Sequence, residues 1–148
     1  MEKDIAIKED YVDVAVKVNA TIVEFGEPYD NAYFENRYVG KEKLILVAYV
    51  DNQPAGYMVS YNKDNDGSFY CWMAGVDPNF RRLGILKKLM DYLIDWVKKR
   101  GYKKIMIKTR NNRREMLSFL VKVGFNFVEI QERPLIEDNW ILLEKEIV

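Results

Sequence analysis

The second half of the chain switches between two hydrophobic periods. Apolar residues recur at helical spacing over residues 84–100, which predicts a long amphipathic helix, and Gly101 stands where a left-handed C-terminal cap belongs. The other elements expected here are strands over residues 69–76, 103–109, 125–130 and 140–147 and a helix over residues 113–123 that ends before Gly124. Strands and helices in this order predict an α/β core of the α+β type with a right-handed crossover connection.

The first half of the chain is less regular. Residues 11–18 alternate between apolar and polar as a strand does, but their apolar set also fits one face of a helix. We expect a helix over residues 10–24, because Gly26 and Pro28 follow it as stop signals. A short helix over residues 30–38 and a hairpin of strands over residues 44–50 and 55–61 complete the prediction. No repeat or linker divides the chain, so residues 1–148 are expected to form a single domain, a mixed central sheet flanked by helices.

Composition narrows the class of protein. Of the 148 residues, 49% are hydrophobic and 14% aromatic, which suits a folded domain and not a disordered tail. No apolar run approaches the ~20 residues that a membrane-spanning helix needs. The segment Met1–Asp4 does not resemble the start of a secretory signal. We therefore expect a cytoplasmic protein that binds no membrane, and a homodimer is compatible with the sequence.

The chain contains no histidine. Catalysis by Ser-His-Asp or Cys-His groups is therefore excluded, and the usual catalytic zinc sites are disfavoured, so no metal site is expected. An enzyme built from this sequence must use carboxylates, tyrosines, backbone donors or the chemistry of a cofactor. Cys71 is the single cysteine, and without an imidazole to activate it we interpret it as a small hydrophobic residue of a strand.

Charge is strongly segregated although the formal net charge is zero. Residues 81–114 contain thirteen lysines and arginines against Asp91 and Asp95 alone, and the rest of the chain is correspondingly acidic. Each charge by itself is typical of a solvated surface. An imbalance of this size predicts that the middle segment binds a polyanion, and that the acidic remainder contacts a cation.

The loop over residues 76–86 joins a predicted strand to the long helix. The first turn of a helix exposes unpaired N–H groups at the positive end of its dipole, which suits an anion. Gly84 would let backbone approach a phosphate closely, and Arg81 and Arg82 add positive charge. The loop lacks both the three spaced glycines of a dinucleotide-binding turn and the Gly-Lys-Ser/Thr of a phosphate loop.

The same loop carries a family resemblance. Val76-Asp77-Pro78-Asn79-Phe80-Arg81-Arg82-Leu83-Gly84-Ile85-Leu86 resembles the Val-x-Pro, aromatic and Arg/Gln-x-x-Gly-x-Gly/Ala sequence of the GNAT N-acetyltransferase superfamily. Phe119-Leu120-Val121-Lys122-Val123-Gly124-Phe125 is similar to that family's helix ending in Gly-Phe, and the hairpin at residues 53–57 and the last strand follow in the family's order. The likeness covers residues 44–148.

The resemblance implies acetyl-CoA as the cofactor and N-acetyl transfer as the activity. In the family, the strand before the loop pairs with the pantetheine, and backbone N–H groups of the loop and helix start hold the pyrophosphate. The positions so implied as cofactor-binding are Ala74, Val76, Arg81, Arg82, Leu83, Gly84, Ile85, Leu86, Lys87 and Asn112. Asn112 is expected either to cap the following helix or to meet the cofactor.

Two positions depart from the family pattern. Leu86 stands where the family prefers glycine or alanine, and we interpret it as a tolerated variant because Gly84 remains. Leu120 stands where many members place a tyrosine that protonates the departing sulfur. A thiol with a pKa of ~8.5 leaves acceptably as a thiolate, so the loss of this acid should slow transfer without abolishing it.

Direct attack by a neutral amine requires a carboxylate to remove the proton of the ammonium. The strand over residues 69–76 contains no acid, so Glu24 and Glu27, in the loop after the first helix, are the candidate catalytic residues. That loop continues as an acidic and aromatic stretch suited to a cation, which predicts a small cationic amine or an exposed peptide amine as the acceptor. Glu129, Glu132 and Glu137 are second choices for the base.

Two alternatives belong to other classes of function. Leu120 and the unlocated base would also suit a catalytically weak or inactive CoA-binding module, which would bind acetyl-CoA without releasing thiol. A nucleic-acid surface is disfavoured, because the basic residues of segment 81–114 alternate with predicted core residues and do not form a tail.

Overall fold

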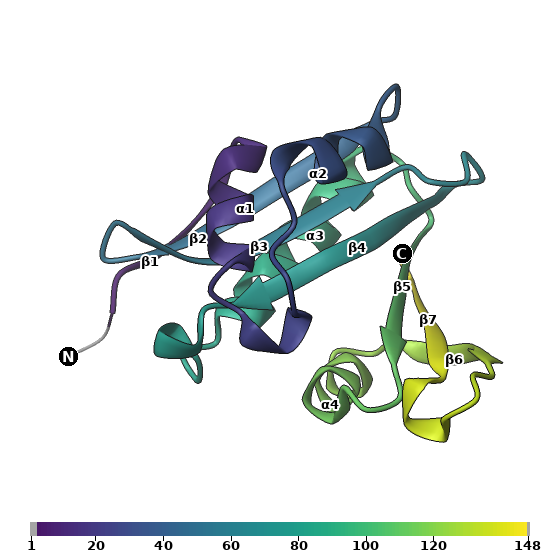
Figure 1. The fold of residues 1–148 in the computed structure, drawn as a ribbon. Helices are drawn as coiled ribbons and strands as arrows, with labels where there is room; N and C mark the ends of the chain where they lie inside the picture. Colours follow the sequence, from purple (N-terminus) through teal and green to yellow (C-terminus); the bar gives the residue numbers. More distant parts are fainter. Residues whose placement is uncertain (1–2, 148) are drawn as a thin grey trace.

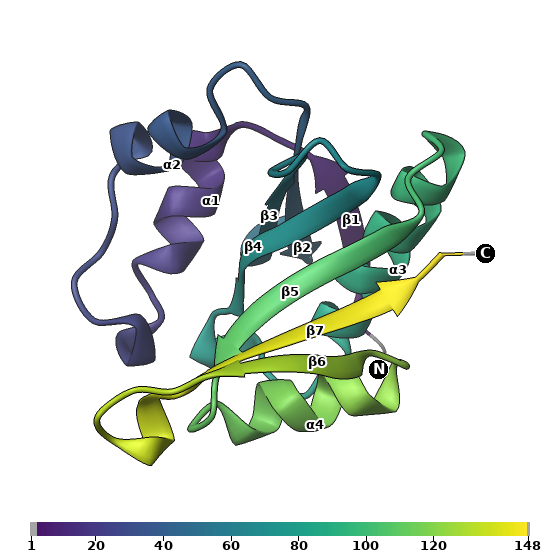
Figure 2. The same cartoon turned by 90° about the vertical axis from the view of Figure 1, so that its right-hand side faces the viewer.

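One seven-stranded sheet organises the chain, with the strand order β1-β2-β3-β4-β5-β7-β6 (Figures 1 and 2). The computed structural model describes residues 3–147. The strands are β1 (Ile5–Glu9), β2 (Lys43–Val50), β3 (Gln53–Tyr61), β4 (Ser68–Val76), β5 (Lys104–Arg110), β6 (Asn126–Gln131) and β7 (Trp140–Glu146). The helices are α1 (Val12–Asn19), α2 (Asn31–Tyr38), α3 (Ile85–Lys99) and α4 (Arg114–Lys122), with short 3-10 turns η1 (Val23–Phe25), η2 (Pro78–Phe80) and η3 (Ile136–Asp138). The expected mixed sheet flanked by helices is confirmed.

The two faces of the sheet bury different cores. Helices α1 and α2 lie over β2, β3 and β4 on one face, where Phe34 and Tyr57 are fully buried. Helices α3 and α4 pack on the other face, where the α3 stripe containing Leu89 and Leu93 is fully buried against the strands. The helical spacing of apolar residues in segment 84–100 therefore corresponds to real burial.

The strands β4 and β5 separate halfway along their length. They are the only parallel neighbours among the described strands, and their pairing runs from Ser68 with Lys104 to Cys71 with Ile107. On the other side of β4, pairing with β3 continues to Val76 and shifts register at Trp72. The end of β4 from Trp72 to Val76 is thus unpaired along the edge that faces β5. We call the point where the two strands separate the fork.

The structure corrects the sequence prediction for the first 25 residues in two places. The helix expected over residues 10–24 ends at Asn19, whose side chain is buried and donates to the Tyr57 hydroxyl at 2.8 Å. The chain then turns and forms η1, which lets Ile22 be buried against β4. The sequence prediction also missed β1, a short strand at the edge of the sheet that pairs with β2. Met1, Glu2 and Val148, the ends of the expected domain, lie outside the described residues.

Gly75 is the position at which the η1 segment rests on β4. A Cβ built there would lie 2.3 Å from Ile22 Cδ1 and 3.1 Å from Phe25 Cε2. Gly75→Ala is therefore expected to lower the free energy of unfolding by about 1–3 kcal/mol through overpacking. Urea denaturation measures this loss. Adding Ile22→Val should recover part of it, and an unchanged stability of the single variant would contradict the close approach.

Candidate active site

The loop between β4 and α3 is shaped by local sequence. Asp77 caps η2, because its carboxylate accepts a hydrogen bond from the Asn79 N–H at 2.9 Å and Pro78 pre-sets the first helical position. Arg82 and Gly84 then both adopt left-handed backbone, with φ of 66° and 77°. Glycine adopts this conformation without strain, whereas an arginine there is uncommon and had no signal in the sequence.

This turn presents unpaired N–H groups at the start of α3. Gly84 is the N-cap residue, and the first helical bond runs from the Lys88 N–H to the Gly84 carbonyl at 3.2 Å. The N–H groups of residues 85–87 therefore have no partner within the helix, and they lie at its positive end. A Cβ built at Gly84 would meet nothing within 4 Å, so the space in front of the loop is open. The geometry suits an anion held by backbone.

The side chains of the expected cofactor-binding loop have several roles. Ile85 is buried in the core beneath α3, and Leu83 and Leu86 pack partly against that core, so these three side chains contribute to packing. Lys87 forms an ion pair with Asp91 at 2.6 Å on the surface of α3. Arg82 is exposed. The half-buried Ala74 and Val76 lie on the unpaired end of β4, as the strand predicted to meet pantetheine requires.

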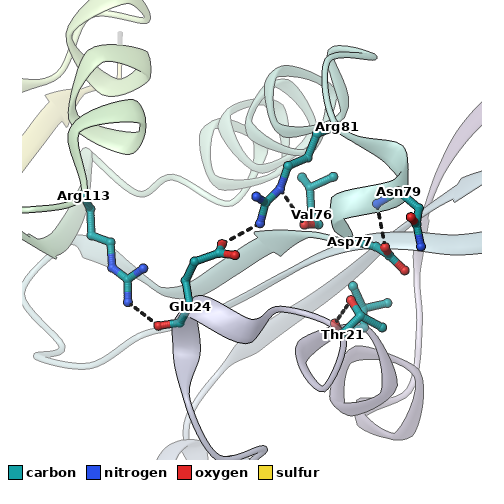
Figure 3. A network of polar contacts seen from close by, with 8 residues as sticks. Thr21, Glu24, Val76, Asp77, Asn79, Arg81 and Arg113 are labelled. Atoms are coloured by element: carbon teal, nitrogen blue, oxygen red, sulfur yellow. Dashed lines mark hydrogen bonds and ion pairs between the residues drawn. The ribbon is translucent and has the colours of Figure 1, made fainter.

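Glu24 connects three parts of the site (Figure 3). Its carboxylate accepts from Arg81 Nη2 at 2.6 Å, and its carbonyl accepts from Arg113 Nη2 at 2.9 Å. Arg81 Nε also donates to the Val76 carbonyl at 3.3 Å. The pKa of Glu24 is lowered, chiefly because the Arg81 guanidinium hydrogen-bonds its carboxylate. The sequence placed Glu24 near the acceptor, but it did not predict its link to Arg81, 57 residues away.

Glu27 lies in the loop between η1 and α2. Before it, Phe25 packs close to Gly75 of β4, and after it Tyr29 stacks on Tyr33, whose ring centroid is 5.7 Å from that of Trp72. The loop therefore runs alongside the unpaired end of β4. Glu27 is exposed and forms no ion pair within residues 3–147. The second-choice acids Glu129, Glu132 and Glu137 are all exposed on β6, the loop after it and η3.

The expectation that Asn112 caps α4 is wrong. The residue at the N-cap position is Arg113, and it makes no side-chain capping bond. The Asn112 N–H instead donates to the Glu137 carbonyl at 3.0 Å, which ties the start of α4 to η3. The helix begins one residue later than a cap at Asn112 would require, because Arg113 adopts the non-helical backbone of a cap.

Leu120 and Cys71 are core residues. Leu120 is fully buried beneath α4, and α4 contains no tyrosine that could take its place near the site. Cys71 is also buried, and burial raises the pKa of its thiol to about 12. A thiol that stays protonated at neutral pH is a poor nucleophile, so the interpretation of Cys71 as a strand hydrophobe is confirmed.

A groove lies between α3 and α4, and Lys87 of the first turn of α3 is part of its lining. Its apolar lining includes Ile94 and Phe119, and the charged residues that border it are Lys87, Lys122, Lys145 and Asp91, which is paired with Lys87. Apolar walls with lysines at the rim suit a nucleotide that carries phosphate.

Comparison with known proteins places the chain in a family. Residues 9–125 match the sequence model of the acetyltransferase (GNAT) family, so the chain belongs to that family. The fold is similar to that of the ribosomal-protein-S18-alanine N-acetyltransferase from Escherichia coli, with a TM-score of 0.82 and 16% identity over 97% of this chain and 94% of that chain. No curated protein sequence is significantly similar to the chain.

Two further structures share the fold. Ard1 from Thermoplasma volcanium has a TM-score of 0.80 at 18% identity over 97% of this chain and 98% of that chain. A GNAT family acetyltransferase from Elizabethkingia anophelis, solved with acetyl-CoA bound, has a TM-score of 0.76 at 20% identity over 96% of this chain and 97% of that chain. At these identities the likeness concerns the fold. No helix within residues 3–147 is long and apolar enough to span a membrane.

Proposed function

We propose that this chain transfers the acetyl group of acetyl-CoA to the primary amine of a small molecule or a peptide. The observation that carries the proposal is the unpaired end of β4 leading directly into the left-handed turn at Gly84. Together they offer a strand edge for the two amides of pantetheine and a set of backbone N–H groups for the pyrophosphate. Family membership and the acetyl-CoA bound to a structural neighbour support this choice.

The direction of β4 orients the cofactor in this proposal. The pyrophosphate site follows Val76, so a pantetheine chain paired with Ala74 and Val76 runs back along β4 toward Trp72. The thioester then lies near the fork, and the nucleotide lies near the groove between α3 and α4. Arg81 is close enough to the Val76 carbonyl to contact the pyrophosphate side of the site.

Acetyl-CoA supplies an activated thioester, and the residues of the chain position it and remove the proton of the acceptor ammonium. A backbone N–H of the segment from Ala74 to Val76 stabilises negative charge on the thioester oxygen. The ammonium of the acceptor must lose a proton before it attacks. We assign that step to Glu27, directly or through water, because its loop runs along the unpaired end of β4.

Glu24 has a different role in this mechanism. Its pairing with Arg81 lowers its pKa, and a carboxylate with a lowered pKa is a weaker base. Glu24 therefore positions Arg81 at the end of β4, although it belongs to the same loop as Glu27. The departing sulfur leaves as a thiolate, because α4 offers no tyrosine and Leu120 is buried.

A second candidate function is a CoA-binding module with weak or no catalysis, which the buried Leu120 favours. Thiol release from acetyl-CoA, measured against polyamines, aminoglycosides, amino acids and short peptides, separates the two. Release with one class of amine supports the enzyme and identifies the acceptor class. Stabilisation of the protein by acetyl-CoA in a thermal shift, with no release from any amine, supports the binding module. The absence of both thiol release and stabilisation by acetyl-CoA would contradict the assignment of acetyl-CoA as the cofactor.

A further inference from the structure

A cluster of cations lies at the fork on the face of the sheet opposite α3. Along β5, Ile105 and Ile107 are buried in the core under α3, so the alternating side chains of Lys108 and Arg110 project from the other face. Lys108 follows directly after the last residue of β5 that pairs with β4. Among the described helices, none covers β5, β7 and β6 on this face, which Figure 2 shows toward the viewer.

Three other elements contribute cations to the same place. The Lys108 ammonium has its pKa lowered by burial first and then by four positive neighbours. These are Lys63 of the β3–β4 loop, Arg133 of the loop after β6, Arg110 of β5 and Arg37 of α2. We call these five residues the basic cluster. Within residues 3–147 none of them forms an ion pair with a carboxylate.

Aromatic side chains hold four of these cations in place. The Arg37 guanidinium carbon lies 4.8 Å from the Trp72 ring centre, and Lys63 Nζ lies 4.9 Å from that of Tyr70. Lys108 Nζ and the Arg110 guanidinium carbon lie 4.7 Å and 3.9 Å from the centre of the Trp140 ring. Arg110 also donates to the Asp138 carbonyl at 2.9 Å. These contacts place four of the five charges over aromatic rings of this face of the sheet, and cation–π attraction favours those positions.

The acids near the cluster leave it uncompensated. Glu144, which alternates with buried Leu143 on β7, is paired with Lys104 at 3.2 Å. Asp64 acts on the pKa values of Tyr61 and Tyr70, and within residues 3–147 it forms no ion pair with a residue of the basic cluster. Like charges held together without a counter-charge cost free energy, which a bound anion would offset.

The anion that fits is not part of acetyl-CoA. The loop at Gly84, where the pyrophosphate is proposed to bind, leads into α3 on the opposite face of the sheet, and the proposed pantetheine path reaches the fork with its uncharged end. Resting on the proposed function, we propose that the acceptor is a small amine that also carries a carboxylate or phosphate, and that the basic cluster binds this anionic group beside the thioester. A polyamine would be repelled by the same five charges, so the cation predicted from the acidic loop is the less suitable acceptor.

Matched pairs of acceptors test the proposal. Thiol release from acetyl-CoA is measured with phosphoethanolamine against ethanolamine, with β-alanine against its amide, and with spermidine. Because a charge-assisted bond is worth more than a neutral one, kcat/KM should be about 10- to 100-fold higher for the anionic member of a pair. The pair with the larger ratio distinguishes phosphate from carboxylate. Equal or faster transfer to the neutral amines or to spermidine would overturn the proposal.

Two variants locate the binding of the anion. Lys108→Gln and Arg37→Gln should each raise KM for the anionic acceptor about tenfold while KM for acetyl-CoA stays unchanged. Lys104→Gln is the matched control, because Lys104 lies on the same strand and face but is paired with Glu144. Circular dichroism verifies that all three variants fold. An equal effect of Lys104→Gln and Lys108→Gln would contradict a specific site.

A second measurement covers the case in which no amine of the panel reacts. Inorganic phosphate is titrated into the full chain labelled with ¹³C-lysine, and the Lys108 resonance is identified by its loss in Lys108→Gln. Saturable binding that raises the pKa of Lys108 supports the proposal, because a bound anion favours the ammonium. A resonance that does not respond would overturn it. This titration needs no acetyl-CoA, so it tests the anion site independently of the proposed function. Failure of the proposed function would be revealed separately, if acetyl-CoA did not stabilise the protein.

Discussion

Gly84→Asp is expected to weaken the binding of acetyl-CoA by about 100-fold, because it places a carboxylate where backbone N–H groups are proposed to hold the pyrophosphate. The open space in front of Gly84 means that the new side chain meets no steric obstacle from the protein. Its negative charge remains at the mouth of the site and repels phosphate. Isothermal titration of acetyl-CoA measures the change in Kd.

Two glycine variants separate charge from backbone strain in this prediction. Gly84→Ala imposes the strain of a side chain at a φ of 77° without adding a charge, so it should weaken binding less than Gly84→Asp. Gly101→Ala imposes similar strain at a φ of 82°, at the opposite end of α3. It should lower stability and leave Kd unchanged. If Gly84→Asp bound acetyl-CoA as tightly as Gly101→Ala, the loop would not be the pyrophosphate site.

Glu27→Gln is expected to lower kcat by about 100-fold at neutral pH, since general-base catalysis is typically worth 10²- to 10⁴-fold. Glutamine keeps the size and polarity of the exposed side chain, so folding should be unaffected. Because amines lose their proton in solution at high pH without help from the enzyme, the deficit should shrink as pH rises toward the pKa of the acceptor ammonium. A pH profile of kcat for both proteins measures this convergence.

Glu24→Gln is the matched comparison, because it removes a carboxylate from the same loop. Arg81 hydrogen-bonds this carboxylate and lowers its pKa, so Glu24 stays ionised through the assay range and is the weaker base. Its loss should change KM for acetyl-CoA through Arg81 more than it changes kcat. A 100-fold loss of kcat in Glu24→Gln with full activity in Glu27→Gln would exchange the two roles.

Local sequence was sufficient for much of the fold. Helix α3 forms within a residue of each predicted end, because its apolar stripe, Gly84 and Gly101 are signals that act over one or two turns. The loop after β4 was predicted for the same reason, since Asp77 and Pro78 shape it through neighbouring backbone groups. Motif resemblance and charge then sufficed to predict the family, and the match over residues 9–125 confirms it.

The sequence prediction missed features that depend on contacts between distant segments. Strand β1 is an edge strand whose pairing depends on β2, about 40 residues away along the chain, and five residues carry too little periodicity to reveal that. Helix α1 ends early because Asn19 bonds Tyr57 and Ile22 packs near Gly75, contacts that no local propensity encodes. The left-handed Arg82 is likewise imposed by the turn it completes and not by its own preference.

The charge pattern shows what local sequence predicts and what only the tertiary structure determines. The excess of cations in segment 81–114 was readable from the chain, and with it the expectation of an anionic ligand. Alternation along β5 sends Lys108 and Arg110 to the face opposite α3, where Arg37, Lys63 and Arg133 join them from other elements. Local periodicity thus predicts which elements form, because they depend on near neighbours, and the charge pattern predicts an anionic ligand; acetyl-CoA as that ligand follows from the family resemblance. The fork, the Glu24–Arg81 pair and the basic cluster arise only when the sheet brings distant segments together, because their distances depend on the order and register of its strands.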